Sequence, residues 1–446
     1  MDGDDDLHHK IASLIPGVRR DLETLVRIPS VSFPGFDPEN VRRSAEATRQ
    51  ILQASGMDAR IIEVPGAHPA VLGSLAAPEG APTVLLYAHH DVQPEGPVEL
   101  WSSPPFEPVE RSGRLYGRGV ADDKSGIVMH AAAIRAWDAR PPVGVTVFVE
   151  GEEESSSEHL GDFLSAYGDL LEADAVILAD SGNWRTGEPA LTVSLRGIAA
   201  CFIEVRTLDH AVHSGEYGGA IPDALTVLAK TLATLHDDQG RVAIPGLASG
   251  PADPLDLTAD EVRQWAGVRP GVDLIGEGGL TERMWTRAAV SILGIDAPRT
   301  PEASNQLVPF ARAKVSLRIP PGQDPEEAME ALVKHLESNV PWGAEVKITR
   351  EASGAPYRIG AHGPGYDAMR RAMTEAFGKE PVDMGAGGSI PFVAEFAKRF
   401  PEATLLLTGA GDPSTNAHSE DESVDLADLE KSCLAEALFL SYLAER

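Results

Sequence analysis

Histidine and carboxylate side chains follow the apolar segments of this sequence, at the point where each segment ends. The apolar segments span 83–88, 145–149, 175–179 and 403–407, and they lead into His89-His90-Asp91, the acidic cluster 150–154, Asp180 and a loop that carries His418. Continuous apolar segments of this length are typical of strands buried on both faces of a parallel sheet. In open α/β sheets the functional crevice lies outside the carboxyl ends of the strands. The pattern therefore predicts that these side chains gather at one edge of one sheet and form a metal site.

The donor types favour a site for two divalent cations. Histidines and several carboxylates supply enough ligands for two ions if one carboxylate bridges them. Imidazole and carboxylate donors without thiolate suit zinc, with cobalt or manganese as alternatives. Two ions about 3.5–4 Å apart activate a water molecule and stabilise the oxyanion that forms when the water attacks. A further carboxylate that is not a ligand is then needed to move the proton.

Each of these residues also has an explanation that involves no metal. Asp122 precedes a predicted helix, where a carboxylate commonly caps the N-terminus. A run of glutamates is commonly a solvated surface, and His90 points to the opposite side of the strand from His89, where a packing or supporting role is expected. Asp91 lies two residues after His89, on the same side, and can hold the imidazole in one tautomer. The combination of these residues at several strand ends favours the metal site.

Composition limits the classes of partner and the compartment. The chain has 446 residues, which exceeds the size of one core and predicts two domains. Its formal net charge of −30 argues against nucleic-acid and anionic-membrane partners. Cys201 and Cys433 provide no disulfide framework, which favours a cytoplasmic protein. The acidic segment Met1 to Lys10 has no apolar core, so we expect no signal peptide, and no apolar stretch is long enough to span a membrane.

The periodicity of the apolar residues changes twice along the chain. Up to about residue 195, strands alternate with helices predicted at 41–55, 124–137 and 160–171, which is typical of a mostly parallel sheet. Segments 199–207 and 313–319 alternate apolar and polar residues, which predicts an antiparallel sheet that helices 224–236 and 325–338 can cover. Residues 244–280 are rich in proline and glycine and predict a long loop with short helical turns. From about residue 360 the first pattern resumes, with helices 366–377 and 426–443 around a glycine-rich turn at 385–388.

This order predicts an α/β fold in which one domain interrupts another. We expect a catalytic domain with a mixed, mostly parallel sheet, built from residues 1–194 and 354–446, and an inserted α+β domain, residues 195–353. His418 then belongs to the first domain although it lies far from His89 in the sequence.

At the same residues the chain resembles the co-catalytic di-zinc metallopeptidases and deacylases, which include carnosinase-like dipeptidases, acetylornithine deacetylase, succinyl-diaminopimelate desuccinylase and aminoacylase. Three segments carry the resemblance: 89–94 is similar to the HxDVxP element, 117–124 to GRGxxDxK, and 150–154 to EGxEE. The resemblance implies a zinc-dependent hydrolase with a homodimeric assembly.

The resemblance also implies a role for each polar residue of these segments. Asp91 would orient His89, Glu153 would be the general base, and Asp122 would bridge the two cations. The metal ligands would be His89, Asp122, Glu154, Asp180 and His418. One cation would be held by His89, Asp122 and Glu154, and the other by Asp122, Asp180 and His418.

The inserted segment resembles the lid and dimerisation domain of the same family. By this resemblance His213, in a segment similar to HSGxxGG, would reach the active site of a neighbouring subunit and polarise the scissile carbonyl. Arg318 would hold the carboxylate of the substrate, and the turn that contains Gly388 and Ser389 would approach the substrate with its backbone. Two departures stand out: Gly385-Ala386 replaces the usual Arg-Glu, which leaves the substrate open, and Ser156 replaces the usual glycine.

These observations predict a metal-dependent dipeptidase or exopeptidase that acts on small peptides. An N-acyl-amino-acid deacylase with the same site is an alternative, and so is a catalytically silent metal-binding protein. A dimetal phosphoesterase is disfavoured because the inserted segment offers few basic groups for phosphate.

Overall fold

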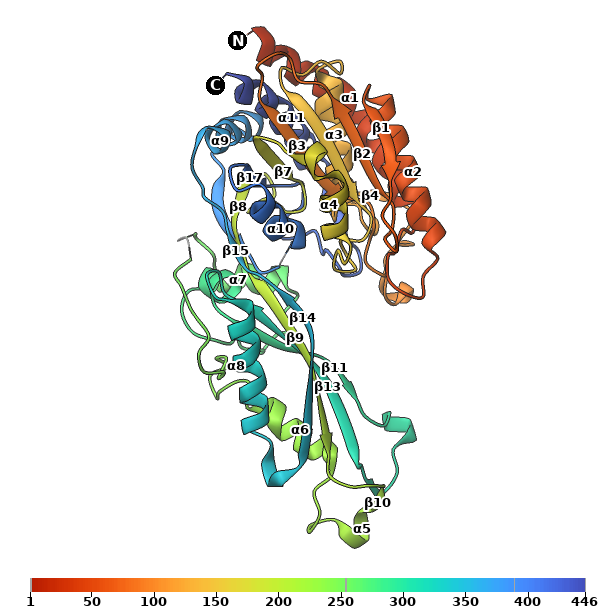
Figure 1. The fold of residues 1–446 in the computed structure, drawn as a ribbon, viewed down its shortest axis with the longest axis vertical. Helices are drawn as coiled ribbons and strands as arrows, with labels where there is room; N and C mark the ends of the chain where they lie inside the picture. Colours follow the sequence, from red (N-terminus) through yellow and green to blue (C-terminus); the bar gives the residue numbers. More distant parts are fainter. Residues whose placement is uncertain (1, 253–254, 389, 446) are drawn as a thin grey trace. The chain divides into compact units, whose positions relative to one another are not determined.

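The computed structural model describes residues 2–252, 255–388 and 390–445. These residues form two units (Figure 1). Unit 1 comprises Met1–Val193, Ile359–Met384 and Pro391–Arg446, and unit 2 comprises Ser194–Arg358 and Gly385–Ile390. The catalytic and lid roles predicted for the two parts of the chain stay predictions.

The main sheet of unit 1 is mixed, with parallel strands at its centre. Its strands lie in the order β1-β2-β6-β3-β7-β17-β8, with bounds β1 Asp58–Ile62, β2 Ala70–Leu75, β3 Thr83–His89, β6 Gly144–Glu150, β7 Ala175–Leu178, β8 Ala190–Leu195 and β17 Thr404–Leu407. The pairs β3–β6, β3–β7 and β7–β17 are parallel, whereas β1, β2 and β8 pair antiparallel with their neighbours. The predicted α/β class with a mixed, mostly parallel sheet is confirmed.

Helices cover both faces of this sheet (Figure 1). One face packs against α1, α2, α3, α9 and α11, whose bounds are Asp2–Val26, Pro38–Ala54, Lys124–Ala136, Pro364–Phe377 and Leu426–Ala444. The other face packs against α4 (Leu160–Leu171) and α10 (Pro391–Arg399) through aromatic rings: Tyr87 lies 4.0 Å from Phe392, and Phe148 lies 6.0 Å from Phe163, measured between ring centroids. The strand interiors are apolar on both faces because both faces are covered.

Two helices of unit 1 were not anticipated from the sequence. The acidic N-terminal segment begins α1, which buries Leu7, Ile11, Val18, Leu22 and Leu25 along one side. Helix α10 follows the glycine-rich turn and buries Phe392 and Phe396. Both helices are stabilised by burial of an apolar side rather than by a strong local signal.

A small second sheet in unit 1 connects segments that are far apart in the sequence. Its strands lie in the order β18-β5-β4, and their bounds are Ser423–Asp425, Arg114–Tyr116 and Val109–Arg111. Strand β18 pairs antiparallel with β5, with Val424 opposite Leu115. The Arg114 guanidinium also donates to both carboxylate oxygens of Asp412, at 2.7 and 3.1 Å. The loop before β18 carries His418 and the loop after β5 carries Asp122, so this pairing brings the two loops together.

Unit 2 is built on an antiparallel sheet. Its strands lie in the order β11-β13-β9-β14, with bounds Ala289–Asp296, Phe310–Ile319, Gly197–Arg206 and Glu345–Gly354. Alternate residues of β9 and β13, such as Cys201, Ile203, Val315 and Leu317, pack against α6 (Ala224–Ala233) and α8 (Pro325–Ser338). The antiparallel sheet predicted from the alternating segments is confirmed. Shorter elements of this unit are β10 Val212–His213, α5 Ser214–Tyr217, α7 Ala259–Trp265, β12 Gln306–Leu307 and β15 Tyr357–Arg358.

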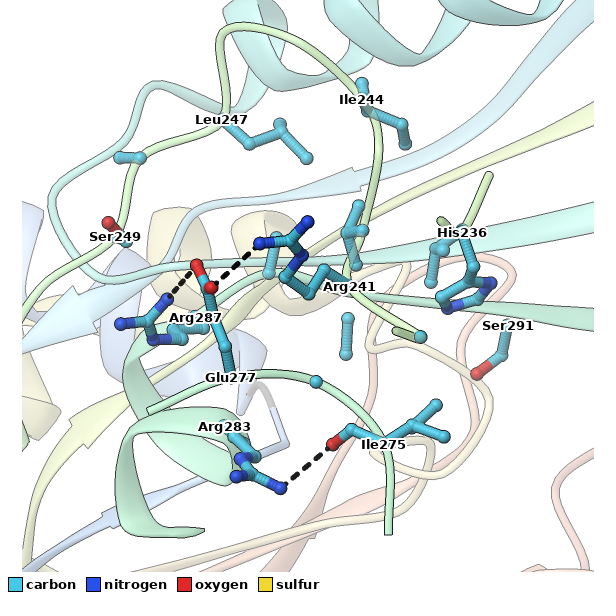
Figure 2. A pocket seen from close by; sticks show the side chains of 17 residues that line it. His236, Arg241, Ile244, Leu247, Ser249, Ile275, Glu277, Arg283, Arg287 and Ser291 are labelled. Carbon is cyan, nitrogen blue, oxygen red and sulfur yellow. Dashed lines mark hydrogen bonds and ion pairs between the residues drawn. The ribbon is translucent and has the colours of Figure 1, made fainter. Parts of the chain in front are cut away.

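The proline- and glycine-rich stretch of unit 2 borders a cavity of about 370 Å³ (Figure 2). Across this cavity Glu277 accepts hydrogen bonds from Arg241, at 3.1 Å, and from Arg287, at 3.3 Å. Arg283 donates to the backbone oxygen of Ile275 at 3.2 Å. These contacts connect segment 275–287 to Arg241, which precedes the stretch, and so fix the course of the last part of the stretch.

No helix in the described part of the chain has both the length and the apolar composition that a membrane span requires.

Candidate metal centre

The side chains predicted to form a metal site belong to unit 1 and lie at the carboxyl ends of its parallel strands. His89 is the last residue of β3, and the acidic cluster follows β6. Asp180 lies two residues beyond β7, and His418 lies in the loop that follows β17. Asp122 precedes α3 and is joined to Asp123 by a cis peptide bond. The parallel alignment of the central strands brings these ends together.

The donor atoms form two groups. His89, Glu153 and Asp180 form one, and Asp122, Glu154 and His418 form the other, and within each group the donor atoms lie within 4.8 Å of one another. This arrangement differs from the division expected from the family resemblance, because Glu154 lies with His418 and Asp180 lies with His89. Both carboxylates follow central strands, and only the three-dimensional arrangement shows which histidine each approaches.

Asp122 lies between the two groups. Its Oδ1 is 3.1 Å from His89 Nε2, and its Oδ2 is 3.0 Å from His418 Nε2. His418 Nε2 is also 3.3 Å from Glu154 Oε2. With one oxygen directed at each histidine, Asp122 is placed as a bridging carboxylate must be.

The buried Asp91 contacts residues of both donor groups. Its carboxylate accepts hydrogen bonds from the backbone N–H groups of Glu153, at 3.2 Å, and Glu154, at 3.1 Å, and from the Ser32 hydroxyl at 2.7 Å. Its Oδ1 is 3.4 Å from His89 Nδ1. Since one ring nitrogen of His89 faces Asp91, the other is directed toward Asp122. His90 is fully buried with its Nε2 on the backbone oxygen of Pro69.

The electrostatics of the cluster are those of a cation site. Burial, followed by repulsion from Asp180, raises the pKa of Glu153 well above its usual value, and burial, followed by repulsion from Asp122, does the same for Asp180. Hydrogen bonds to Asp122 and Glu154 raise the pKa of His418 to about 11. The carboxylates of the two donor groups lie close to one another and are buried, so their negative charges repel. Divalent cations would stabilise the ionised forms of these carboxylates. The residues present therefore fit two divalent cations in donor type and in charge.

The glycine before Asp122 is required by close packing. Gly119 has φ of 77°, and a Cβ at that position would lie 2.3 Å from Cγ1 of Val92. A side chain there would separate the Asp122 loop from the segment that follows β3.

Several supporting residues were missed by the sequence analysis. Gln93 donates to both oxygens of Glu154, at 3.1 Å from its backbone N and 2.7 Å from its Nε2. Glu422 accepts from the backbone N of Asp122 at 3.2 Å. Lys124 is fully buried, and its Nζ donates to the backbone oxygens of Leu25 and Ile28. Lys124 occupies the last position of the GRGxxDxK element, whereas the sequence signal for Gln93 and Glu422 is that they lie near predicted ligands.

The predicted substrate-binding residues belong to unit 2. His213 is exposed and accepts a hydrogen bond from the N–H of Gly215 through Nδ1 at 3.0 Å. Arg318 is half-buried on β13, and its guanidinium group makes no hydrogen bond or ion pair with a described residue. Gly388 is exposed, and Ser389 lies outside the described residues. The roles predicted for these four residues stay predictions.

Comparison with known proteins shows the family to which this chain belongs. The model of peptidase family M20/M25/M40 matches residues 85–441, which include all five predicted metal ligands. A cysteinylglycine-S-conjugate dipeptidase of Corynebacterium striatum is 34% identical over 440 residues, covering 96% of each chain. A Cys-Gly metallodipeptidase of Schizosaccharomyces pombe is 30% identical over 411 residues, covering 87% of this chain and 84% of the relative.

Solved structures show the same fold. The crystal structure of human carnosine dipeptidase 1 matches with a TM-score of 0.87 and 23% sequence identity, covering 99% of both chains. The resemblance to carnosinase-like dipeptidases stated from the motifs is confirmed.

Proposed function

The chain belongs to peptidase family M20/M25/M40, and on that premise we propose that it is a metal-dependent dipeptidase. One observation carries the proposal: Asp122 lies 3.1 Å from His89 and 3.0 Å from His418, and the donor group of His89 contains Glu153, a carboxylate beyond the five proposed ligands. A site that only stored a cation would not need a carboxylate in excess of the ligands.

The proposed cofactors are two divalent cations, zinc in the first place, with manganese or cobalt as alternatives. Imidazole and carboxylate donors without thiolate support this choice. His89 and Asp180 would hold one cation, Glu154 and His418 the other, and Asp122 both. Such a pair of cations supplies a nucleophile at neutral pH and stabilises the negative charge that develops on the attacked carbonyl oxygen.

Glu153 is the proposed proton carrier. Its backbone N–H is fixed on Asp91, and its side chain is buried beside Asp180, which keeps the pKa of Glu153 above its usual value. A carboxylate with a raised pKa is a stronger base, so it accepts a proton from water more readily before passing it to the leaving amine. In this proposal the contacts of Asp91 hold Glu153, Glu154 and His89 in fixed positions during the proton transfer.

The proposed substrates are dipeptides with free ends. The names of the relatives support a small peptide, since two of them are dipeptidases for cysteinylglycine or its conjugates. In this proposal Arg318 holds the substrate carboxylate, His213 polarises the scissile carbonyl, and Gly388 and Ser389 contact the substrate through the turn.

We also propose a homodimer in the cytoplasm. Strand β11 is an edge of its sheet within unit 2, and it exposes the apolar side chains of Ile292, Leu293 and Ile295. An unpaired edge with exposed apolar residues supports pairing with a second copy.

Cys201 and Cys433 are both free and buried, which supports a reducing compartment.

A paired assay tests the activity. The purified chain is treated with a chelator, reloaded with Zn²⁺ or Mn²⁺, and given pooled dipeptides in one reaction and N-acetyl amino acids in another, with products identified by mass spectrometry. We expect metal-dependent loss of dipeptides and little change in the N-acetyl compounds. Cleavage of the N-acetyl compounds alone would show a deacylase, and no cleavage with either metal would show a silent metal-binding protein.

A further inference from the structure

Glu422 is a fully buried carboxylate that collects donors from the loop of Asp122. Its Oε1 accepts from the backbone N–H groups of Ala121, at 3.0 Å, and Asp122, at 3.2 Å. Its Oε2 accepts from the backbone N of Gly119 and from Nη1 of Arg118, both at 2.8 Å. Four donors on one buried carboxylate fix the course of this loop through the residue that bridges the two donor groups.

Arg118 extends this contact to the segment that holds Glu154. It is almost fully buried, and its second terminal nitrogen, Nη2, donates to the backbone oxygen of Pro94 at 3.2 Å. Its guanidinium carbon lies 5.3 Å from the centre of the Trp101 ring. The residue before Pro94 is Gln93, which donates to both oxygens of Glu154.

Glu422 also lies four residues after His418, at the start of the pairing between β18 and β5. Its backbone oxygen accepts from the N–H of Gly117 at 2.9 Å. The Glu422–Arg118 pair therefore connects the segments of Asp122, Glu154 and His418, which are the three members of one donor group. Among the described residues it makes no hydrogen bond to His89, Glu153 or Asp180, the members of the other group.

We propose that Glu422, together with Arg118, is a positioning residue that sets the affinity of the Asp122–Glu154–His418 site for its cation more strongly than that of the His89–Asp180 site, which shares only Asp122 with it. This inference rests on the proposed function only in taking the two donor groups as cation sites. Ligand atoms must be held to within a few tenths of an ångström, and partners behind the ligands commonly change metal affinity about 10- to 100-fold when they are removed.

The isosteric variant Glu422→Gln tests the proposal. Only one end of its amide group can accept, so in either orientation the NH₂ group faces two of the four donors, while the side-chain volume is unchanged. Equilibrium dialysis with Mn²⁺, read by mass spectrometry for metals and by electron paramagnetic resonance, measures how many ions bind and whether they are coupled. We expect two coupled ions in the unaltered chain. In Glu422→Gln we expect one tightly bound, uncoupled ion, with the second bound about 10-fold more weakly or worse and restored at high Mn²⁺.

Glu420→Gln is the matched control, because Glu420 lies two residues away on the exposed side of the same loop and bonds only the Ser419 hydroxyl among the described residues. It should bind two coupled ions. Two coupled ions of unchanged affinity in Glu422→Gln would overturn the proposal, and so would equal weakening of both ions, which is what a purely structural role predicts.

If Glu422→Gln does not fold, Arg118→Lys takes its place. Lysine keeps the charge beside Glu422 but has no second arm for the Pro94 oxygen, so it should weaken binding of the second ion more than that of the first. A chain that binds two ions but hydrolyses no dipeptide would contradict the proposed function. The effect of Glu422→Gln on metal affinity could still be measured in that case.

Discussion

Backbone amides hold Asp91 and Asp123, two carboxylates that support the metal centre, whereas Glu422 also accepts from the Arg118 side chain. Asp91 accepts from the N–H groups of Glu153 and Glu154, and Asp123 accepts from the N–H of His89 at 3.3 Å. A backbone donor orients a carboxylate without placing a full positive charge next to it. The negative charge of the ligands therefore remains available to cations.

At the residue scale, Glu153→Gln should abolish turnover while leaving the metal content unchanged. Glutamine has the same size but cannot carry a proton between water and the leaving group. We expect dipeptide hydrolysis to fall at least about 10²-fold, with the metal content unaltered. Steady-state kinetics and metal analysis on the same preparation measure both quantities. Near-normal turnover would remove Glu153 from the proton-transfer role.

Glu150 should make stability depend on pH. Burial raises the pKa of this side chain to about 7, whereas in the unfolded chain it titrates near 4.3. The folded state therefore binds the extra proton, so this contribution to stability is complete below about pH 4 and is lost as pH rises to about 7. Above that pH the ionised, buried carboxylate costs up to about 4 kcal/mol.

Glu150→Gln removes this titration. Urea unfolding of both proteins at pH 5 and pH 8, with equal metal content, should show that the variant gains stability relative to the unaltered chain at the higher pH. The same difference in unfolding free energy at both pH values would contradict the prediction.

At the element scale, short strand pairings and single side chains fix the positions of long loops. Strand β18 has three residues, yet its pairing with β5 brings the His418 loop beside the Asp122 loop. In unit 2, Arg196 has a similar function, because its side chain donates to the backbone oxygens of Gly387, at 3.2 Å, and Arg287, at 3.4 Å. Segment 275–287 is thus held by Arg196 and by the ion pairs of Figure 2.

Arg196→Met should loosen the glycine-rich turn. The substitution leaves the carbonyl groups of Gly387 and Arg287 without their donor, so backbone amides in 385–388 and 283–287 should exchange with deuterium about 10-fold faster. Hydrogen-exchange mass spectrometry measures this change. Arg206→Met is the control: Arg206 is the last residue of β9, the strand that begins directly after Arg196, but it is exposed and bonded to Glu204. Equal exchange in the two variants would refute the positioning role of Arg196.

At the scale of the whole molecule, the proposed dimer depends on the edge of one sheet. Ile295 on β11 is 51% exposed, although isoleucine is normally buried. Ile295→Glu should shift the chain from dimer to monomer, because it places a charge where the second copy would pack. Light scattering after size-exclusion chromatography measures the mass. Val272→Glu, at an equally exposed apolar position away from β11, should leave the mass unchanged. A monomeric unaltered chain would contradict the dimer.

Local patterns in the sequence were sufficient to predict the main elements. The apolar segments 83–88, 145–149 and 175–179 lie in or directly beside β3, β6 and β7, and the alternating segments lie in β9 and β13. Helices α4 and α8 have the predicted bounds. These predictions succeeded because a strand or helix with one buried side has apolar residues at a regular spacing, and that spacing is visible in the sequence. The polar residues at the strand ends were predicted for the same reason.

Only the tertiary structure decided how those residues combine. The grouping of Glu154 with His418 and of Asp180 with His89 depends on where each carboxylate points after its strand ends. The position of Glu422 under Asp122 depends on the pairing of β18 with β5, which are separated by about 300 residues in the chain. Contacts of this kind form between surfaces that exist only after the chain has folded, so no local period in the sequence records them.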